Sequence, residues 1–384
     1  MKRIKLSFLA IGTVSILSTS NANTFSDALT NGKISGDVAI TYESRNFEKE
    51  TDIYYSNTAY SVGSIGLNYK TASFNNFTAE IGFRAYTKLY EKDSDFITYH
   101  GTGDSTERIY DEEGLSILSR ANIAYDIDNL HIKVGRQLLS DDWLTNVHDA
   151  VTLHSNIINN LELELIYSDR FGRARARDLR PMTNTNENKG IYKAGLTYKF
   201  NELLKANAFY YIAADFYDMY GGKLYLDKQY SNIKVGTSIH MLELSAENDV
   251  SKDGELLELK AYFNIAGYTG TLGYVDNKKA DIWGTAGKAG FNIVPFEEGD
   301  SMLKADTKTT YFMLSKNVLG ISLIGLYGIF DYGDYKASEF DIWAGYKINK
   351  DTSFNLGYAM TSEDDKDTSL SDMQQLNATV TYKF

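Results

Sequence analysis

The chain has 384 residues, a formal net charge of −12, no cysteine and two prolines. The acidic balance argues against nucleic acid as a partner, and the absence of cysteine excludes a fold held by disulfide bonds. The composition favours a protein made mostly of hydrogen-bonded strands. Its 29 tyrosines suit strands, and proline, which lacks the N–H that a strand ladder needs, is nearly absent.

Residues 1–22 predict a cleaved secretory signal peptide. A charged start (residues 1–5) precedes a short apolar stretch (residues 6–17), and Ser20 and Ala22 place small residues where a signal peptidase cleaves. A membrane anchor is the alternative, but a spanning helix needs about 20 apolar residues. We therefore expect an exported protein in which residues 23–384 form a single transmembrane domain.

Apolar and polar residues alternate with a period of two along most of the remaining chain, as in strands with one face against an apolar environment. In residues 33–45 the apolar positions are Ile34, Val38, Ile40 and Tyr42. The alternation recurs in residues 77–84, 161–168, 192–200, 354–360 and 376–384. Such strands suit a transmembrane barrel, where each tilted strand needs about 9–11 residues.

The connections between these strands are of two kinds that take turns. Short ones, rich in Asn and Asp, fall at residues 75–76, 128–129, 159–160, 201–202, 231–232 and 349–350, and longer polar ones at 93–114, 175–190 and 281–304. Short periplasmic turns and long outer loops are typical of outer-membrane barrels. The pattern predicts an all-β fold: a transmembrane antiparallel β-barrel of about 18 strands. Sixteen is the alternative count, because the parity is ambiguous in residues 223–230 and 304–318.

The final strand ends on Tyr382 and Phe384, two residues apart on its apolar face. A terminal aromatic residue in this position resembles the signal that the barrel-assembly machinery reads. We therefore expect Tyr382 and Phe384 to serve as an assembly signal, and we expect outer-membrane lipid and lipopolysaccharide around the barrel.

The opposite parity identifies side chains that would face a lumen. A barrel of this size leaves an aqueous channel. Its predicted lining includes the acidic residues Glu43, Glu80, Glu162 and Glu164 and the basic residues Arg84, Lys88, Arg120, Lys133 and Arg170. Arg136 has the wrong parity, so it requires a bulge or a place at the rim.

An arginine cluster stands out in this acidic chain. Its members are Arg170, Arg173, Arg175, Arg177 and Arg180. One interpretation is a track of guanidinium groups that attracts carboxylates, which arginine binds through two parallel hydrogen bonds. The alternative is a loop that is solvated or that contacts lipopolysaccharide phosphates.

Acidic residues fall in two of the outer loops: Asp141 and Asp142 in the third, and Glu297 and Glu298 in the seventh. If either loop folds into the barrel, these carboxylates would face the basic residues across a constriction, and such charges set pore selectivity. The alternative is that both loops are solvated and point outward.

The eighteen-strand layout and the segment KVGRQLL at residues 133–139 resemble the OprD family of substrate-selective porins, in the versions of campylobacter-like proteobacteria. The resemblance implies a monomeric channel for small carboxylates with a constriction shaped by the third and seventh loops. It also implies a basic ladder, which would correspond to Arg84, Arg120, Arg136, Arg170 and Arg173. The short third loop, residues 140–147, departs from the family.

No sequence feature favours an enzyme. The chain has five histidines, but it shows no phosphate-binding loop, dinucleotide fingerprint or metal-ligand spacing. We expect no catalytic residue, no metal and no cofactor. The predicted function is an outer-membrane porin for small hydrophilic solutes that prefers carboxylates, as a monomer or a trimer. The alternative is a structural or adhesive barrel with a closed lumen.

Overall fold

The computed structural model describes residues 22–47, 57–93, 97–98, 101–102, 108–109, 116–247, 252–364 and 372–384. Except for Ala22, the predicted signal peptide lies outside the described residues. The first element, α1 (Phe25–Thr30), begins at a capping box in which Thr24 and Asp27 each bind the other's backbone N–H. None of the helices in these ranges is long and apolar enough to cross a membrane.

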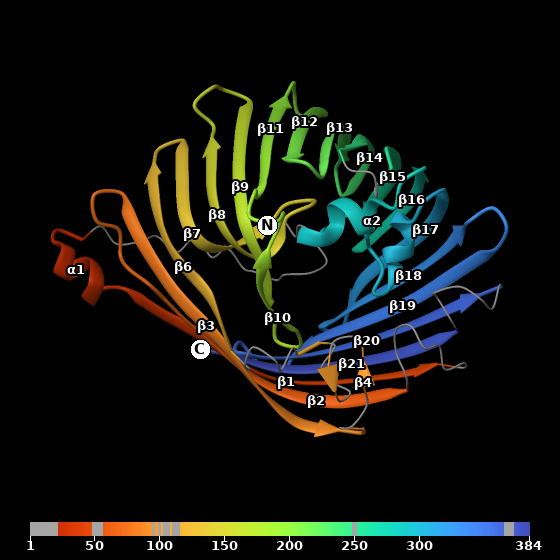
Figure 1. Cartoon of the computed structure of the whole chain (residues 1–384), viewed down its shortest axis with the longest axis horizontal. Coiled ribbons are helices and arrows are strands. Elements are labelled where there is room, and N and C mark those ends of the chain that lie inside the picture. The colour runs from red at the N-terminus through yellow and green to blue at the C-terminus, as the bar shows by residue number, and fades with distance from the viewer. Residues whose placement is uncertain are drawn as a thin grey trace.

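Long antiparallel strands follow one another and form a ring (Figure 1). They are β1 (Lys33–Phe47), β2 (Thr58–Lys70), β3 (Phe77–Glu91), β6 (Ser116–Ile127), β7 (Leu130–Ser140), β8 (Thr145–Ser155), β9 (Leu161–Ala174), β11 (Ile191–Lys199), β12 (Leu204–Ala213), β13 (Tyr217–Tyr230), β14 (Ile233–Ala246), β15 (Gly254–Ile265), β16 (Tyr268–Lys278), β17 (Thr307–Val318), β18 (Ile321–Asp331), β19 (Lys336–Lys347), β20 (Thr352–Glu363) and β21 (Met373–Lys383). The prediction of an antiparallel barrel with 18 strands is confirmed, and the count of sixteen is wrong.

The ring closes between the first and last strands. β1 and β21 pair from Asp37↔Lys383 to Phe47↔Met373. Gly36 and Phe384 extend this ladder, since each backbone N–H donates to the carbonyl of the other, at 2.9 and 3.0 Å. Closure removes the free sheet edge that could not be satisfied in a bilayer.

The turns at one end have the backbone that the sequence predicts. Asn76, Asp128 and Asn160 adopt positive φ values of 68°, 41° and 62°. Asn and Asp tolerate this left-handed conformation better than most residues. We take this end as periplasmic, since short turns mark that side in such barrels.

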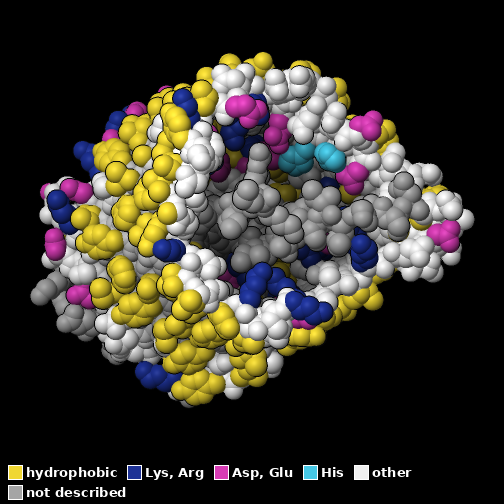
Figure 2. Space-filling model, turned by 180° about the vertical axis from the view of Figure 1, so that it is seen from behind, with side chains coloured by type: hydrophobic (Ala, Val, Ile, Leu, Met, Phe, Trp, Pro, Cys, Tyr) yellow, Lys and Arg dark blue, Asp and Glu magenta, His cyan; other side chains and the backbone are white. Residues whose placement is uncertain are grey.

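Large apolar side chains on the outer wall are exposed, whereas their neighbours in sequence face inward. Ile81, Leu196, Leu272 and Val380 are examples. In the space-filling view, hydrophobic side chains spread over the outside of the wall and charged ones gather around the central hollow (Figure 2). The inward/outward alternation read from the sequence is therefore the alternation between lumen and lipid.

The outer connections are numbered L1 to L9 in chain order. L2 (residues 92–115) contains β4 (Ile97–Thr98) and β5 (Gly101–Thr102), and L4 (175–190) contains β10 (Leu179–Asn184). L7 (279–306) contains α2 (Ile282–Thr285), η1 (Ala286–Ala289) and η2 (Gly299–Leu303). L3 (141–144) and L5 (214–216) are short. Pro181 lies in β10 of L4 and Pro295 in L7, so both prolines avoid the barrel strands.

L7 and L4 enter the ring of strands, where α2 and β10 are seen (Figure 1). Apolar residues of L7, including Ile282, Ile293, Phe296 and Met302, are buried in one cluster with inward-facing residues of β11–β18. A second cluster buries Leu179 of L4 and Ile109 of L2 against inward-facing residues of β2, β3 and β6. The two loops therefore pack on opposite inner walls.

Leu272→Lys tests the assigned faces. Leu272 is 54 % exposed near the middle of β16, and a lysine there should destabilise the folded barrel by roughly 2–4 kcal/mol, because a charge at the bilayer midplane is poorly solvated. The free energy of unfolding in lipid vesicles, from a denaturant titration, measures the effect. Thr271→Lys, whose side chain points to the lumen, is the control. Equal losses in both variants would contradict the assignment.

Candidate functional site

L7 approaches the inner wall so closely that the wall needs a glycine. The ring of Phe296 packs against those of Tyr311 and Phe330, with centroids 5.7 and 5.0 Å apart. A Cβ atom at Gly328 would lie only 2.2 Å from Phe296 Cζ. The absent side chain of Gly328 is therefore what admits Phe296 to the wall of β17 and β18.

The backbone of L7 is bound to β19 by two buried carboxylates. The N–H of Glu297 donates to Asp341 Oδ2 (3.1 Å), and that of Glu298 donates to Glu339 Oε1 (2.8 Å). Glu339 and Asp341 are two residues apart, so both point to the lumen. This pair of contacts fixes where the side chains of Glu297 and Glu298 emerge.

These two glutamates meet three arginines from different parts of the chain, and we call the set, together with Glu43, the central network. It comprises Glu43 and Arg45 of β1, Arg108 of L2, Arg177 of L4, and Glu297 and Glu298 of L7. Arg177 Nη2 donates to Glu297 Oε1 at 2.6 Å. Glu298 Oε1 accepts from Arg45 (3.2 Å) and Arg108 (3.4 Å), and Glu43 lies 3.2 Å from Arg108.

Amides of the last strand complete the network. Gln375 Nε2 and Asn377 Nδ2 each donate to Glu297 Oε1, both at 3.1 Å. Gln375 Oε1 in turn accepts from Arg45 Nε at 2.6 Å. β21 therefore joins L7 to β1 on the lumen side, where the barrel also closes.

The two adjacent glutamates of L7 differ in their protonation. Burial opposes ionisation of Glu297, but the Arg177 and Arg108 guanidinium groups outweigh it and lower its pKa below the usual value. At Glu298, burial prevails over Arg45 and Arg108, so the pKa is raised. Glu297 is thus the firmly ionised partner, and Glu298 protonates at a higher pH than an ordinary glutamate.

Two arginines at the junction of β9 and L4 share one carboxylate. Arg173 and Arg175 each lie 3.7 Å from Asp178 Oδ2. The arginine side chains are 35 % and 31 % exposed, whereas that of Asp178 is only 4 % exposed. Despite burial, the neighbouring arginines, Arg173 foremost, lower the pKa of Asp178, so this group of three carries a net positive charge.

L4 is held against the inner wall by hydrogen bonds to its backbone. Tyr86 Oη donates to the carbonyl of Arg175 (2.8 Å) and Ser64 Oγ to that of Ala176 (3.0 Å). Arg180 lies over the ring of Phe171, 5.3 Å from its centroid. Apart from Arg170, the arginine cluster thus lies inside the barrel rather than in an exposed loop.

The carboxylates of L3 pair with lysines of the wall, not with the arginines. Asp141 contacts Lys193 of β11 and Tyr211 of β12, and Asp142 contacts Lys223 of β13. Burial raises the pKa of Asp141. Lys223 outweighs burial at Asp142 and lowers its pKa. L3 is also tied to L7, since the N–H of Asn292 donates to the carbonyl of Asp142 at 2.8 Å.

Most other predicted lumen residues form local ion pairs along the wall. Arg84 contacts Asp37 and the hydroxyl of Ser64, Arg120 lies 3.1 Å from Glu80, and Lys88 lies 3.6 Å from Glu91. Lys133 lines a cavity of about 330 Å³ next to β6–β9. Most of the predicted basic wall is therefore paired with carboxylates and does not form a row of free cations.

Arg170 does not share the face of Glu162 and Glu164, and that part of the sequence interpretation is wrong. A β-bulge at Asp149/Ala150 shifts the pairing of β8 with β9, so Arg170 lies opposite Asp149. Arg136 also lies opposite Asp149 and binds it through two hydrogen bonds of 2.7 Å. Gly135 beside it has φ +111°, and β7 stops pairing with β6 at Arg136. This bend accommodates Arg136.

Several members of these clusters were not singled out in the sequence as site residues. They are Arg108, Asp178, Lys223, Glu339, Gln375 and Asn377. Alternation alone identifies Glu339, two residues before Asp341, and Gln375 and Asn377, which alternate with apolar residues in the last strand. Nothing local identifies Arg108, because it comes from a long loop whose path depends on the barrel around it.

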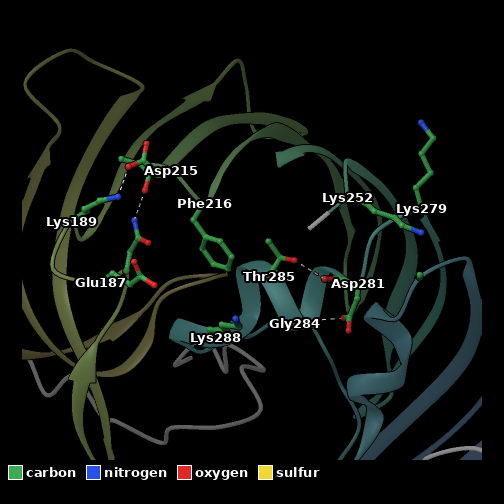
Figure 3. A pocket seen from close by; sticks show the side chains of 13 residues that line it. Glu187, Lys189, Asp215, Phe216, Lys252, Lys279, Asp281, Gly284, Thr285 and Lys288 are labelled. Atoms are coloured by element: carbon green, nitrogen blue, oxygen red, sulfur yellow. Dashed lines mark hydrogen bonds and ion pairs between the residues drawn. The ribbon is translucent and has the colours of Figure 1, made fainter. Parts of the chain in front are cut away.

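A second charged region lines the outer mouth (Figure 3). A cavity of about 740 Å³ there lies between L4, L5, L6 and L7. Four lysines line it, Lys189, Lys252, Lys279 and Lys288, together with Phe216, Glu187, Asp215 and Asp281. Lys189 pairs with Asp215, and Lys288 lies over the ring of Phe216, 5.0 Å from its centroid.

An eighteen-strand membrane barrel with charged loops folded into its lumen defines a class: the outer-membrane channel fold of the OprD/Occ type. Residues 94–318 match the model of a family described as "Putative outer membrane protein", and this match covers more than half of the chain. The chain belongs to that family. No curated protein sequence matches it.

Solved structures of outer-membrane channels share the fold. OccAB4 of Acinetobacter baumannii has a TM-score of 0.72 at 14 % identity, over 92 % of this chain and 98 % of its own. OccD3 (OpdP) of Pseudomonas aeruginosa has a TM-score of 0.70 at 15 % identity, over 94 % and 92 %. OpdK of P. aeruginosa, solved with vanillate, has a TM-score of 0.69 at 15 % identity, over 93 % and 99 %.

Arg177→Ala should loosen L7. Glu297 is nearly buried and would lose its 2.6 Å partner, which should cost roughly 2–3 kcal/mol of stability. Thermal unfolding in detergent measures the loss, and limited proteolysis within L7 locates it. The double variant Arg177→Ala/Glu297→Ala should recover part of the stability, because no charge is then left unpaired. Strictly additive losses would show that the two residues are not coupled.

Proposed function

We propose that the protein is an outer-membrane channel for passive diffusion of small hydrophilic solutes, with a preference for molecules that carry a carboxylate. The observation that carries the proposal is the pair formed by Arg173, near the end of β9, and Arg175, at the start of the inward-folded L4. Each of the two side chains is about one third exposed, and both lie near a single buried carboxylate, Asp178. A carboxylate of the solute can therefore bind Arg173 and Arg175 while Asp178 stays in place between them.

The chemistry of arginine favours this class of solute. Its planar group offers two parallel N–H donors to a carboxylate and keeps its charge. The contrast with the central network is informative, because Arg45, Arg108 and Arg177 there are already matched by Glu43, Glu297 and Glu298. Arg173 and Arg175 at the junction of β9 and L4, rather than the central network, thus supply the net positive charge.

Lysines at the outer mouth of the barrel add further positive charge. Lys252 and Lys288 line the cavity of Figure 3, and neither has an ion pair within the described residues. Cations at a pore entrance raise the local concentration of anions. The relative OpdK was solved with vanillate, an aromatic carboxylate, which supports the same solute class for this chain.

The other expected partners belong to the same proposal. Tyr382 and Phe384 are exposed at the periplasmic end of β21 with their rings stacked, 6.3 Å between centroids, which supports a role in recognition by the barrel-assembly machinery. The apolar outer wall suits membrane lipid and, in the outer leaflet, lipopolysaccharide. A monomer suffices for a pore. Passive diffusion through the pore requires no catalytic residue, no cofactor and no metal ion.

One observation favours the alternative of a closed, structural barrel. The central network and the carboxylates that hold the L7 backbone are densely packed. Five of these side chains are buried: Glu43, Arg45, Gln375, Glu339 and Asp341. Conductance distinguishes the two functions, because a closed barrel passes no ions.

In planar bilayers, we expect the purified protein to form stable channels that prefer anions. We also expect proteoliposomes to swell faster in amino acids and organic acids than in neutral sugars of the same size. Liposome swelling rates and single-channel currents measure both properties. Absence of channels across repeated insertions would remove the porin function and leave the structural one.

The double variant Arg173→Gln/Arg175→Gln should lower anion preference, because it removes the net positive charge at the junction of β9 and L4. The reversal potential across a KCl gradient should shift toward zero. The matched control Lys199→Gln/Lys205→Gln removes two cations at the periplasmic end and should leave the reversal potential nearly unchanged. Similar shifts in both pairs would show that overall charge, and not Arg173 and Arg175 in particular, sets the preference.

A further inference from the structure

Four side chains capable of binding metals form one row across the inner wall at the periplasmic end. Asp126 of β6 lies opposite His131 of β7, His131 lies opposite His154 of β8, and His154 lies opposite Glu164 of β9. Neighbouring strands are about 4.8 Å apart, so the four positions are adjacent. All four line the cavity of about 330 Å³ that Lys133 also lines. We call them the histidine row.

Each imidazole in the row is held by a carboxylate on its outer side. His131 Nδ1 lies 3.0 Å from Asp126 Oδ1, and His154 Nδ1 lies 3.5 Å from Glu164 Oε1. Because an ionised carboxylate only accepts hydrogen bonds, it favours the tautomer that carries the proton on Nδ1. The Nε2 atom of each ring is then an unprotonated donor of an electron pair, and neither Nε2 has a hydrogen bond within the described residues.

The row differs from the other described histidines. His148 is fully buried and both its ring nitrogens are engaged, with Ser168 and with the carbonyl of Thr145. His240 is also buried, beside Glu258. By contrast, the side chains of His131 and His154 are 50 % and 40 % exposed. The space-filling view shows histidine side chains at the edge of the central hollow (Figure 2).

A carboxylate on Nδ1 and an open Nε2 is the arrangement of metal-binding histidines, in which the carboxylate orients the ring and makes it more basic. We infer that His131 and His154 bind one divalent transition metal ion through their Nε2 atoms, with Asp126 and Glu164 as positioning residues. Imidazole ligands select ions such as Zn²⁺, Ni²⁺ and Cu²⁺ over Mg²⁺ and Ca²⁺, which prefer oxygen.

The site has two protein ligands, and water completes the coordination. Within the part of the chain that the structure describes, no three His, Asp or Glu side chains surround a single point. Two nearby lysines offset the negative charge of the two carboxylates in the row, since Lys193 contacts Glu164 and Lys133 lies near Asp126. An open site of this kind suits an ion in transit, because conduction needs binding weak enough to allow release.

Calorimetric titration of the full barrel in detergent, without a histidine tag, tests the inference. ZnCl₂ should bind with one ion per barrel, and MgCl₂ should not bind. His131→Ala and His154→Ala should each weaken Zn²⁺ binding by about tenfold or more. Asp126→Asn should weaken it by a smaller factor, of the order found for residues that orient a metal ligand. Because protons compete for Nε2, the affinity should fall on acidification.

Ser140→Ala is the matched control, since Ser140 lines the same cavity but lies outside the row. It should bind Zn²⁺ as the wild type does. Circular dichroism shows whether each variant folds. If a histidine variant does not fold, Asp126→Asn still tests the inference. Absence of Zn²⁺ binding to the wild type, or binding with wild-type affinity by either histidine variant, would overturn the inference. The titration needs no transport, so its result is independent of whether the barrel conducts solutes.

Discussion

The pairing of every backbone polar group is the constraint on which the rest of the structure depends. A bilayer core offers no water to an open sheet edge, and the ladder between β1 and β21, extended by Gly36 and Phe384, removes that edge. Closure fixes the face of each residue along all eighteen strands. It thereby collects side chains that are far apart in sequence, such as Arg45 and Gln375, on one inner surface.

A barrel of this width leaves a lumen, and the inward loops decide what remains of it. L7 packs its apolar residues on one inner wall and L4 packs on the opposite one. The buried carboxylates of Glu339 and Asp341 hold the L7 backbone in place. Because Glu297 and Glu298 then reach Arg45, Arg108 and Arg177, the centre is neutralised by paired charges, while the net positive charge lies at Arg173 and Arg175, where β9 meets L4.

The histidine row illustrates how register creates chemistry that no local motif contains. His131 and His154 belong to adjacent strands. In the sequence, each is separated from its carboxylate by a short periplasmic turn. Only the pairing of β6, β7, β8 and β9 aligns the four side chains. For the same reason, no single segment of the sequence carries a metal-ligand spacing that would reveal these four residues.

The sequence by itself determined the barrel, an approximate strand number, the tight turns at Asn76 and Asp128, and the inward face of residues such as Glu43 and Arg84, because period-two alternation and turn propensity are local. It did not determine the bulge that turns Arg170 toward Asp149, the pairing of Asp141 with Lys193, or the arrival of Arg108 at Glu43. Those depend on where loops pack after the ring has closed, and packing between distant segments leaves no periodic signal in the chain.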